Sequence, residues 1–375
     1  MSSDPEDRLG PSEMARPVRT AWIAGAETFE SFGRVLQPLA VGLVDEMVEV
    51  VVFSPTTSVG QGPGVGPREV VSYSPSRWWW PNGATVTALA EQLRGRKIEL
   101  LHGLDGSVAR LTHAVSRAAR VGYLLSCYSL ADAGRIGEAA RSATALFAAS
   151  EPIRRALVSR AACPSERVRL MRPGVYHVQQ PTCLDAPDQR VAIIAGGPLD
   201  DFEALEAVLL CFSELAARKY DCVFFLIGSG QAERRLRRRA EELHLNRQLT
   251  FADCRPMGQL TGIFKAADVY LSPTSQERID MPSLLAMAAG VPVLAAAGTG
   301  ASDFLRDGQT AMFFSRGNGA ELTVKLSSLL DDRPSARALA KSAIEYVHAN
   351  HSPAVNVTAL AHFYRQAVAG PAEPV

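Results

Sequence analysis

The sequence predicts an α/β protein made of two domains, each built on a doubly wound parallel sheet. Apolar stretches of strand length alternate with stretches of helical period along the chain, and this alternation is typical of parallel sheets. The polar segment 177–190 carries two prolines and shows neither period, so it predicts an interdomain linker. A chain of 375 residues is long enough for two domains.

The first half predicts a domain over residues 17–176. Residues 1–16 are polar and contain proline, which predicts a disordered tail. Short apolar runs predict strands at 20–24, 48–53, 98–101, 123–126, 143–148 and 168–171. Between them, helical periodicity predicts helices over 34–45, 85–94 and 107–120.

The second half predicts another domain over residues 191–352. It restarts with an apolar strand at 191–195, which is followed by a helix with one apolar face. That face comprises Leu205, Val208, Leu209, Phe212 and Leu215. Further strands are expected at 223–227, 249–251, 268–271, 291–295 and 311–314, with a helix over 259–266.

The richest motif follows the strand expected at 268–271. Glu277 comes just after that strand, and Ser283 to Ala289 reads as a helix with Pro282 at its first turn and Gly290 beyond its end. Ligands of open α/β sheets bind at the carboxyl ends of the strands, and the amide groups of a helix N-terminus favour an anionic group such as a pyrophosphate. The motif therefore predicts a ligand site around Glu277.

This motif resembles that of the retaining glycosyltransferases of family four, which carry Glu-x-Phe-Gly-x-Pro-x-x-Glu-Ala-Met-Ala-x-Gly-x-Pro-Val. The matching positions are Glu277, Pro282, 286–288, Gly290 and 292–293. The resemblance continues through Gly228-Ser-Gly230, 264–269 and 303–310, and more weakly through 99–102, 149–151 and 172–175. It implies the GT-B fold, in which two Rossmann-like domains face a central cleft, with a helix over 353–375 that crosses back onto the first domain.

The resemblance also implies site residues. Glu277 would orient the sugar of a nucleotide-sugar donor, and Tyr128, which stands where the family has a His, would line the cleft together with His102. The segment 25–33 stands where the family has an acceptor and phosphate loop, but Glu27 and Glu30 would repel phosphate, which favours an acceptor-side or purely structural role. It implies a nucleotide sugar as co-substrate, no metal and no other cofactor. The expected donor-binding residues are Gly228, Gly230, Arg278, Pro282, Ser283, Gly298 and Gly300.

Four positions depart from the family at donor contacts. Gly197 and Phe202 stand where the family has an Arg and a Lys, Leu285 replaces the second Glu of the motif, and Tyr128 replaces the His. Each charge-assisted contact contributes about 1.5 to 3 kcal/mol. Losing both cations therefore predicts donor binding weaker by roughly two to four orders of magnitude.

Several of these residues also have a structural interpretation. Leu285 reads most simply as a core leucine, His102 as a histidine capping a strand, and Gly298-Thr-Gly300 as an ordinary turn. Arg278 either replaces a missing cation or forms a solvated loop pair with Asp280. The arginine-rich run 234–239 is typical of a solvated helix face. The three consecutive tryptophans at 78–80 are expected either to pack partly against the protein or to form a surface that binds the acceptor or a partner.

Composition narrows the function classes. Lys plus Arg equals Asp plus Glu at 39 each, so no overall charge points to nucleic acid or an anionic membrane. No run of about 18 or more apolar residues predicts a membrane span, and the start of the chain lacks a signal-peptide core. We therefore expect a cytoplasmic protein without a transmembrane segment. The six cysteines are scattered without metal-ligand spacing, so we expect reduced, buried thiols.

Two functional hypotheses follow. The first is a retaining hexosyltransferase that moves a sugar from a nucleotide donor to an acceptor, which would be a glycan, a lipid or a small molecule. The second is a catalytically inactive homologue that binds sugar, acts as a scaffold or activates a protein partner, and the four departures favour it. An NAD-type oxidoreductase would share the fold, but no Gly-x-Gly-x-x-Gly follows a first strand.

Overall fold

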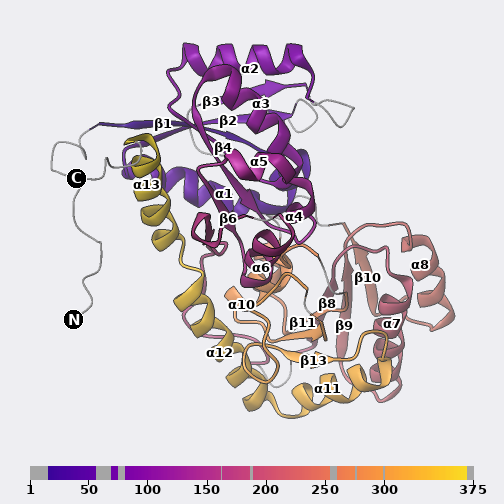
Figure 1. Cartoon of the computed structure of the whole chain (residues 1–375). Coiled ribbons are helices and arrows are strands. Elements are labelled where there is room, and N and C mark those ends of the chain that lie inside the picture. Colours follow the sequence, from indigo (N-terminus) through magenta and orange to yellow (C-terminus); the bar gives the residue numbers. More distant parts are fainter. Residues whose placement is uncertain are drawn as a thin grey trace.

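The chain folds into two α/β domains, each with an all-parallel sheet, as the computed structural model in Figure 1 shows. The structure describes residues 16–55, 69–74, 81–161, 163–185, 189–253, 260–274, 277–298 and 300–369. The three tryptophans at 78–80, Cys254 and the expected tail up to residue 15 lie outside these ranges. No helix among the described residues is long and apolar enough to cross a membrane.

The N-terminal sheet has seven strands in the order β3-β2-β1-β4-β5-β6-β7. Most of its strands are runs of buried apolar residues, as parallel strands covered on both faces require. The strands are β1 (Val18–Ile23), β2 (Val48–Pro55), β3 (Glu69–Tyr73), β4 (Leu100–Gly103), β5 (Gly122–Cys127), β6 (Ala145–Ala148) and β7 (Val168–Leu170).

The C-terminal sheet has six strands in the order β10-β9-β8-β11-β12-β13. The chain runs from β8 outward to β9 and β10, and then returns to place β11 on the other side of β8. The strands are β8 (Val191–Gly196), β9 (Cys222–Ile227), β10 (Leu249–Ala252), β11 (Val269–Ser272), β12 (Val293–Ala296) and β13 (Met312–Phe314). This reversal of direction between β8 and β11 defines a topological switch point.

Helices cover both sheets. Those of the N-terminal half are α1 (Ala26–Asp45), α2 (Gly83–Gly95), α3 (Ala109–Ala119), α4 (Asp132–Arg135), α5 (Gly137–Ser142) and α6 (Glu151–Arg160), with 3₁₀ turns at η2 (Gly106–Val108) and η3 (Ser165–Arg167). Those that follow are α7 (Phe202–Ala217), α8 (Glu233–Glu242), α9 (Leu260–Phe264), α10 (Met281–Ala288), α11 (Gly319–Asp331), α12 (Arg333–Asn350) and α13 (Pro353–Ala369).

Two elements differ from the sequence-based expectation. Helix α1 begins at Ala26, so most of the segment expected as an acceptor and phosphate loop at 25–33 is helical. Its N-cap residue Gly25 donates its amide proton to Asp105 Oδ2 at 2.8 Å, and Phe32 of the helix packs on Tyr128 with ring centroids 4.2 Å apart. Strand β3 was not expected, because it is a short edge strand with mostly exposed residues.

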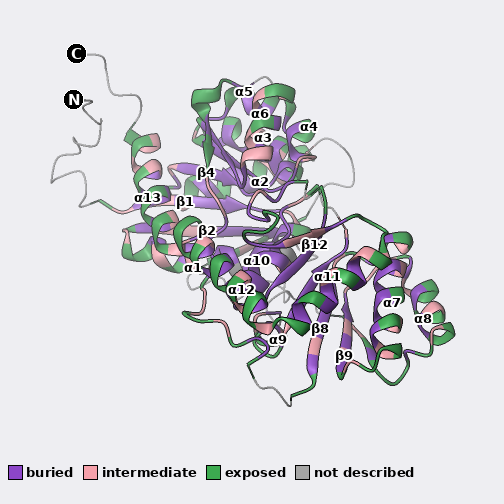
Figure 2. Ribbon diagram, turned by 90° about the horizontal axis from the view of Figure 1, so that it is seen from below, coloured by how far each residue is buried: buried purple, intermediate pink, exposed green. Residues whose placement is uncertain are grey.

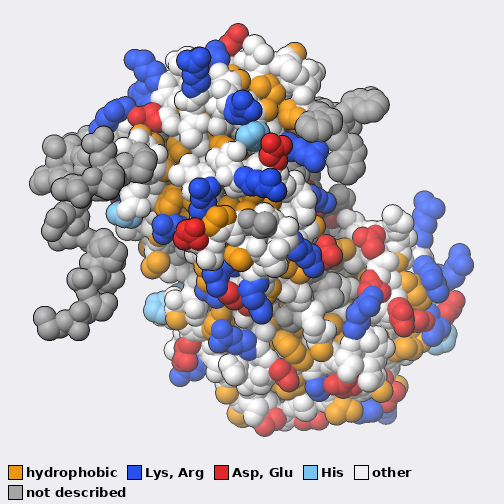
Figure 3. All heavy atoms as spheres, viewed as in Figure 1, with side chains coloured by type: hydrophobic (Ala, Val, Ile, Leu, Met, Phe, Trp, Pro, Cys, Tyr) orange, Lys and Arg blue, Asp and Glu red, His pale blue; other side chains and the backbone are white. Residues whose placement is uncertain are grey.

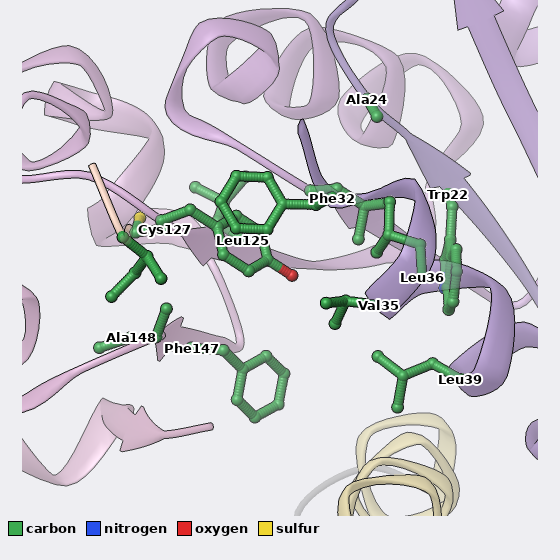
Figure 4. Packing of buried hydrophobic residues seen from close by; sticks show 14 of the residues in the cluster. Trp22, Ala24, Phe32, Val35, Leu36, Leu39, Leu125, Cys127, Phe147 and Ala148 are labelled. Atoms are coloured by element: carbon green, nitrogen blue, oxygen red, sulfur yellow. The ribbon is translucent and has the colours of Figure 1, made fainter. Parts of the chain in front are cut away.

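The cores lie on both faces of each sheet, as the purple strands in Figure 2 show. Figure 4 shows part of the N-terminal core, where side chains of α1 such as Phe32, Val35 and Leu36 approach Leu125 and Phe147 of the sheet. The apolar face expected for the helix after β8 is fully buried in α7. The five described cysteines are buried and free.

Helix α13, the last element, packs against α1, β1 and β4 of the N-terminal domain. It follows α12, which contacts α10 of the C-terminal domain, so the chain end crosses from one domain to the other (Figure 1). The Trp22 indole N–H donates to the Tyr364 hydroxyl at 2.9 Å, which anchors α13 on β1.

Candidate active site at the domain interface

The carboxyl ends of β5 and β11 lead into two segments that pair with each other across the domain interface. The Leu130 amide donates to the Glu277 carbonyl at 2.7 Å, and the Ile279 amide donates to the Tyr128 carbonyl at 2.9 Å. Between these bonds, Ser129 and Arg278 form an antiparallel bridge. The backbone of the predicted donor motif is therefore held directly against the N-terminal domain.

Glu277 is exposed in this arrangement, although its carbonyl is held by Leu130. The next residue, Arg278, points to the other domain, where its Nη2 lies 2.9 Å from Glu27 Oε2 on α1. The two side chains are 24% and 71% exposed, so the pair lies at the rim of the interface. Arg278 thus forms an ion pair with a carboxylate of the protein. That it binds a donor phosphate stays a prediction.

Asp280 is not part of a solvated loop pair, contrary to one of the two interpretations from sequence. It is 4% exposed, and its Oδ2 accepts the hydroxyl protons of Ser272 and Ser283, both at 2.6 Å. Its Oδ1 accepts the Ser283 amide at 3.1 Å, which caps α10 at the turn containing Pro282. Burial raises the pKa of the Asp280 carboxyl, and the hydrogen bonds from Ser272 and Ser283 oppose that rise.

This cap changes the environment of Ser283, a predicted donor-binding residue. Its amide and its hydroxyl both donate to Asp280, and the residue is fully buried. The N-terminus of α10, which the sequence predicts to bind a pyrophosphate, therefore already holds a carboxylate of the protein. A second anion there would face repulsion from Asp280.

Tyr128 and His102 are placed by the structure in the core of the N-terminal domain. Tyr128 is 9% exposed and stacks on Phe32, and burial raises the pKa of its hydroxyl. His102 is 1% exposed, and its two ring nitrogens lie 2.6 Å from the Tyr364 hydroxyl and 2.9 Å from the Ser126 hydroxyl. Burial lowers the pKa of His102 to about 3, so the ring is neutral near pH 7. The expectation that these side chains line the cleft does not match these positions, because α13 and α1 cover them.

The glycines predicted to approach the donor serve different local needs. Gly228 has φ of 144° and packs against the Gly197 carbonyl, where a side chain would clash. Gly230 similarly lies against the backbone of Leu199, and its turn is fixed by Asp200, which accepts the Gln231 amide at 2.8 Å. Gly298 and Gly300, with φ of 86° and 59°, turn the chain after β12.

The positions that depart from the family have structural partners. Leu285 is buried in the core, as the simpler interpretation predicted. The guanidinium of Arg235 lies over the ring of Phe202, with Arg235 Cζ 3.6 Å from the ring centroid. The arginine run forms the exposed face of α8, with Leu236 and Ala240 buried, and Figure 3 shows acidic neighbours beside it. Arg237, for example, pairs with Glu233 at 2.8 Å.

Sequence reasoning missed four polar residues at these sheet edges. Asp105 holds the Gly25 amide, and Asp132 Oδ2 accepts the amides of Tyr128 and Ser129, both at 2.9 Å. Tyr270 and Thr274 carry buried hydroxyl groups that have no hydrogen-bond partner among the described residues. Asp105, Asp132 and Thr274 follow apolar strands, and this position is the sequence signal that could have revealed them, whereas Tyr270 lies inside β11 and carries no such signal.

Comparisons with known proteins bear on this interface. The family model described as "Glycosyl transferases group 1" matches residues 185–346. This part of the chain is similar to the group 1 glycosyl transferases. It contains β8 to β13, Glu277 and the α10 cap. The matched region thus includes the segment 277–280 on the C-terminal side of the interface.

Two curated relatives also match part of the chain. The D-inositol 3-phosphate glycosyltransferase of Corynebacterium diphtheriae is 27% identical over 191 residues, 49% of this chain and 45% of that protein. The sulfoquinovosyl transferase of Arabidopsis thaliana is 23% identical over 55% of this chain and 41% of its own length. The chain thus spans about half the length of the curated relatives it matches.

The structural likeness to solved proteins extends beyond the matched region. The structure of Anabaena HepE in complex with UDP and glucose superimposes with a TM-score of 0.74 at 14% identity, covering 92% of this chain and 99% of HepE. A sucrose-phosphate synthase from Thermosynechococcus elongatus gives 0.72 at 16% identity, with 94% and 99% covered. The whole chain therefore has the GT-B fold expected from the sequence.

Proposed function

We propose that this protein transfers a hexose from a nucleotide-sugar donor to an acceptor hydroxyl with retention of the anomeric configuration. The observation that carries the proposal is the position of Glu277, exposed at the carboxyl end of β11 within the family-matched region and held by its carbonyl against Leu130. The like-folded HepE structure contains UDP and glucose, which supports a nucleotide sugar as the donor. The acceptor would be a glycan, a lipid or a small molecule.

Glu277 would contribute by accepting hydrogen bonds from the donor sugar. A carboxylate binds sugar hydroxyls through charge-assisted bonds, which are stronger than neutral ones. The pairing of 277–279 with 128–130 would hold this carboxylate in one place relative to both domains. Positioning of this kind lowers the cost of reaching the transition state.

The test uses the full chain and three donors. UDP-, GDP- and ADP-glucose are titrated calorimetrically, while release of the free nucleotide diphosphate is followed in parallel. We expect saturable binding of one donor and slow hydrolysis that yields the α-anomer, with no effect of a chelator. Absence of binding for all three donors would contradict the proposal. A β-anomeric product would contradict the retaining mechanism.

A second candidate is a catalytically inactive relative that binds sugar, acts as a scaffold or activates a protein partner. The observation that favours it is Asp280, whose buried carboxylate takes the Ser283 amide at the start of α10. This alternative predicts that Asp280→Gly, which frees that amide, creates binding of UDP where the wild-type chain shows none.

A further inference from the structure

A buried tyrosine hydroxyl lies at the switch point between β8 and β11 and has no hydrogen-bond partner among the described residues. In open α/β sheets, ligands bind outside the carboxyl ends of the strands at the topological switch point, and β8 and β11 form that point here. Tyr270 of β11 pairs in register with Ile194 of β8. Its hydroxyl reaches the last residue of β8, because a Cβ on Gly196 would lie only 2.9 Å from Tyr270 Oη. The glycine thus lets the hydroxyl reach the switch point.

The hydroxyl of Tyr270 is buried and unpartnered. The residue is 1% exposed, and its Oη has no hydrogen-bond partner among the described residues. Two residues beyond the end of β11, the Thr274 hydroxyl is also buried without a partner. Leaving such groups unpaired destabilises a protein, so buried tyrosine hydroxyls normally find an acceptor. Tyr73 is an example, since its hydroxyl donates to the Ala24 carbonyl at 3.2 Å.

The charge beside these hydroxyls indicates what they would bind. Burial raises the pKa of Tyr270 well above its ordinary value, and the carboxylate of Asp280 raises it further. Asp280 also accepts the hydroxyl proton of Ser272 at 2.6 Å, and Ser272 lies two residues from Tyr270 on the same face of β11, so the carboxylate would repel a phosphate placed there. A neutral group rich in hydroxyls meets no such repulsion and can both donate and accept hydrogen bonds.

We propose that Tyr270, together with Thr274, binds a hydroxyl of the hexose of the donor and so contributes to donor selection. This inference rests on the proposed function and deepens it. A site that offers hydrogen bonds to a substrate hydroxyl discriminates against analogues that lack it, because its own buried groups are then left unpaired. The two hydroxyls would therefore favour nucleotide sugars over the bare nucleotide.

The test compares Tyr270→Phe with the wild-type chain in two measurements. Donor affinity is measured with whichever of UDP-, GDP- or ADP-glucose binds the wild type, and with the matching nucleoside diphosphate. We expect the sugar donor to bind about three- to tenfold more weakly, the range for one hydrogen bond, and the diphosphate to bind unchanged. The Tm should rise, because the variant no longer buries an unpaired hydroxyl.

Two further variants serve as controls. Tyr73→Phe removes a hydroxyl that has a partner, so we expect a lower Tm and unchanged donor affinity. Thr274→Val should weaken binding of the sugar donor, as Tyr270→Phe does, and should leave the affinity for the diphosphate unchanged.

The outcomes separate the two proposals. If the wild-type chain binds no donor, the proposed function fails and this inference fails with it. If the wild type binds a donor and Tyr270→Phe binds it equally well, only this inference is overturned. Equal weakening of the sugar donor and the diphosphate would also overturn it, because the hydroxyl would then contact the nucleotide rather than the hexose.

Discussion

The carboxyl edges of the two sheets face each other but use their polar groups differently. On the N-terminal edge, Asp105 and Asp132 are buried and accept backbone amides, and both ring nitrogens of His102 have partners. On the C-terminal edge, Asp280 is satisfied by Ser272 and Ser283, but Glu277 is exposed, and the buried hydroxyls of Tyr270 and Thr274 have no partner among the described residues. The first edge pairs these polar groups within the fold, whereas the second leaves three of them without an internal partner in the described part of the chain.

This difference suggests that the two domains have different roles. The N-terminal edge would act as a rigid frame that holds the segment 128–130, and this segment holds 277–279 through backbone bonds. The C-terminal edge would supply recognition. Substitutions on the first edge should therefore change stability, and substitutions on the second should change binding or turnover.

The largest effect is expected at Asp132. Asp132→Ala leaves the amides of Tyr128 and Ser129 without their acceptor, and each buried orphan costs about 1 to 3 kcal/mol. We expect the free energy of unfolding in urea to fall by roughly 2 to 6 kcal/mol. Asp132→Asn is the matched control, because its carbonyl oxygen can accept both bonds while burial disfavours the charged form of Asp132. Equal losses in the two variants would contradict the role of the acceptor.

The next effect tests the other edge. Glu277→Gln removes the charge of the proposed sugar contact, so turnover should fall by on the order of 10- to 100-fold, corresponding to about 1.5 to 3 kcal/mol. Because the side chain is exposed, the Tm should stay unchanged. Glu27→Gln, on the opposite side of the interface, is the control and should leave turnover within about twofold. Unchanged turnover in Glu277→Gln would reduce this residue to a structural role.

The free energy of unfolding should also depend on pH. Burial lowers the pKa of His102 to about 3 and that of His351 to about 4, below the ordinary value of about 6.5. The unfolded chain therefore binds protons first as the pH falls. The stability from each group is fully present above about pH 6.5 and is lost below it, at about 1.4 kcal/mol per pH unit.

The measurement is the urea midpoint between pH 7 and pH 5. His102→Gln should make its pH dependence shallower. The raised pKa values of Asp132 and Asp280 act in the opposite direction, because burial favours protonation of these carboxyls in the folded chain as the pH falls. A slope that His102→Gln does not change would argue against a buried neutral imidazole.

The smallest effect is expected at the rim of the interface. Arg278→Gln breaks the ion pair with Glu27, whose carboxylate is 71% exposed, so the free energy of unfolding should change by about 0 to 1 kcal/mol. A double-mutant cycle with Glu27→Gln, repeated at high salt, isolates the pair. A coupling energy much larger than this would mean that the Arg278–Glu27 pair stabilises the folded chain substantially.

Much of the fold could be predicted because its signals are local. The strand at 191–195, the apolar face of α7 and the Pro282-to-Gly290 helix all follow from periodicity and end signals. Strand β3 escaped prediction because an exposed edge strand has little apolar pattern. The segment at 25–33 was assigned to a loop from the resemblance, but contacts with Asp105 and Tyr128, distant in sequence, favour a helix.

The candidate site was predicted in part. Sequence indicated the place of Glu277, because the strand before it and the helix after it are local features. It did not indicate which way Tyr128 and His102 point, because segments distant in the chain cover them: α13 contacts His102, and Phe32 of α1 stacks on Tyr128. Nor did it show that Asp280 caps α10, since its partner Ser272 lies eight residues earlier, across a turn.

The sequence by itself determined the class of the fold, the two-domain order of the chain and the position of the Glu277 motif, because alternation, helix ends and motif spacing are properties of neighbouring residues. Only the tertiary structure decided which polar groups are satisfied and which are left for a ligand. The hydroxyl of Tyr270 and the ring of His102 are both buried side chains on parallel strands. They differ in the partners that distant segments bring to them, and burial makes the presence or absence of those partners energetically decisive.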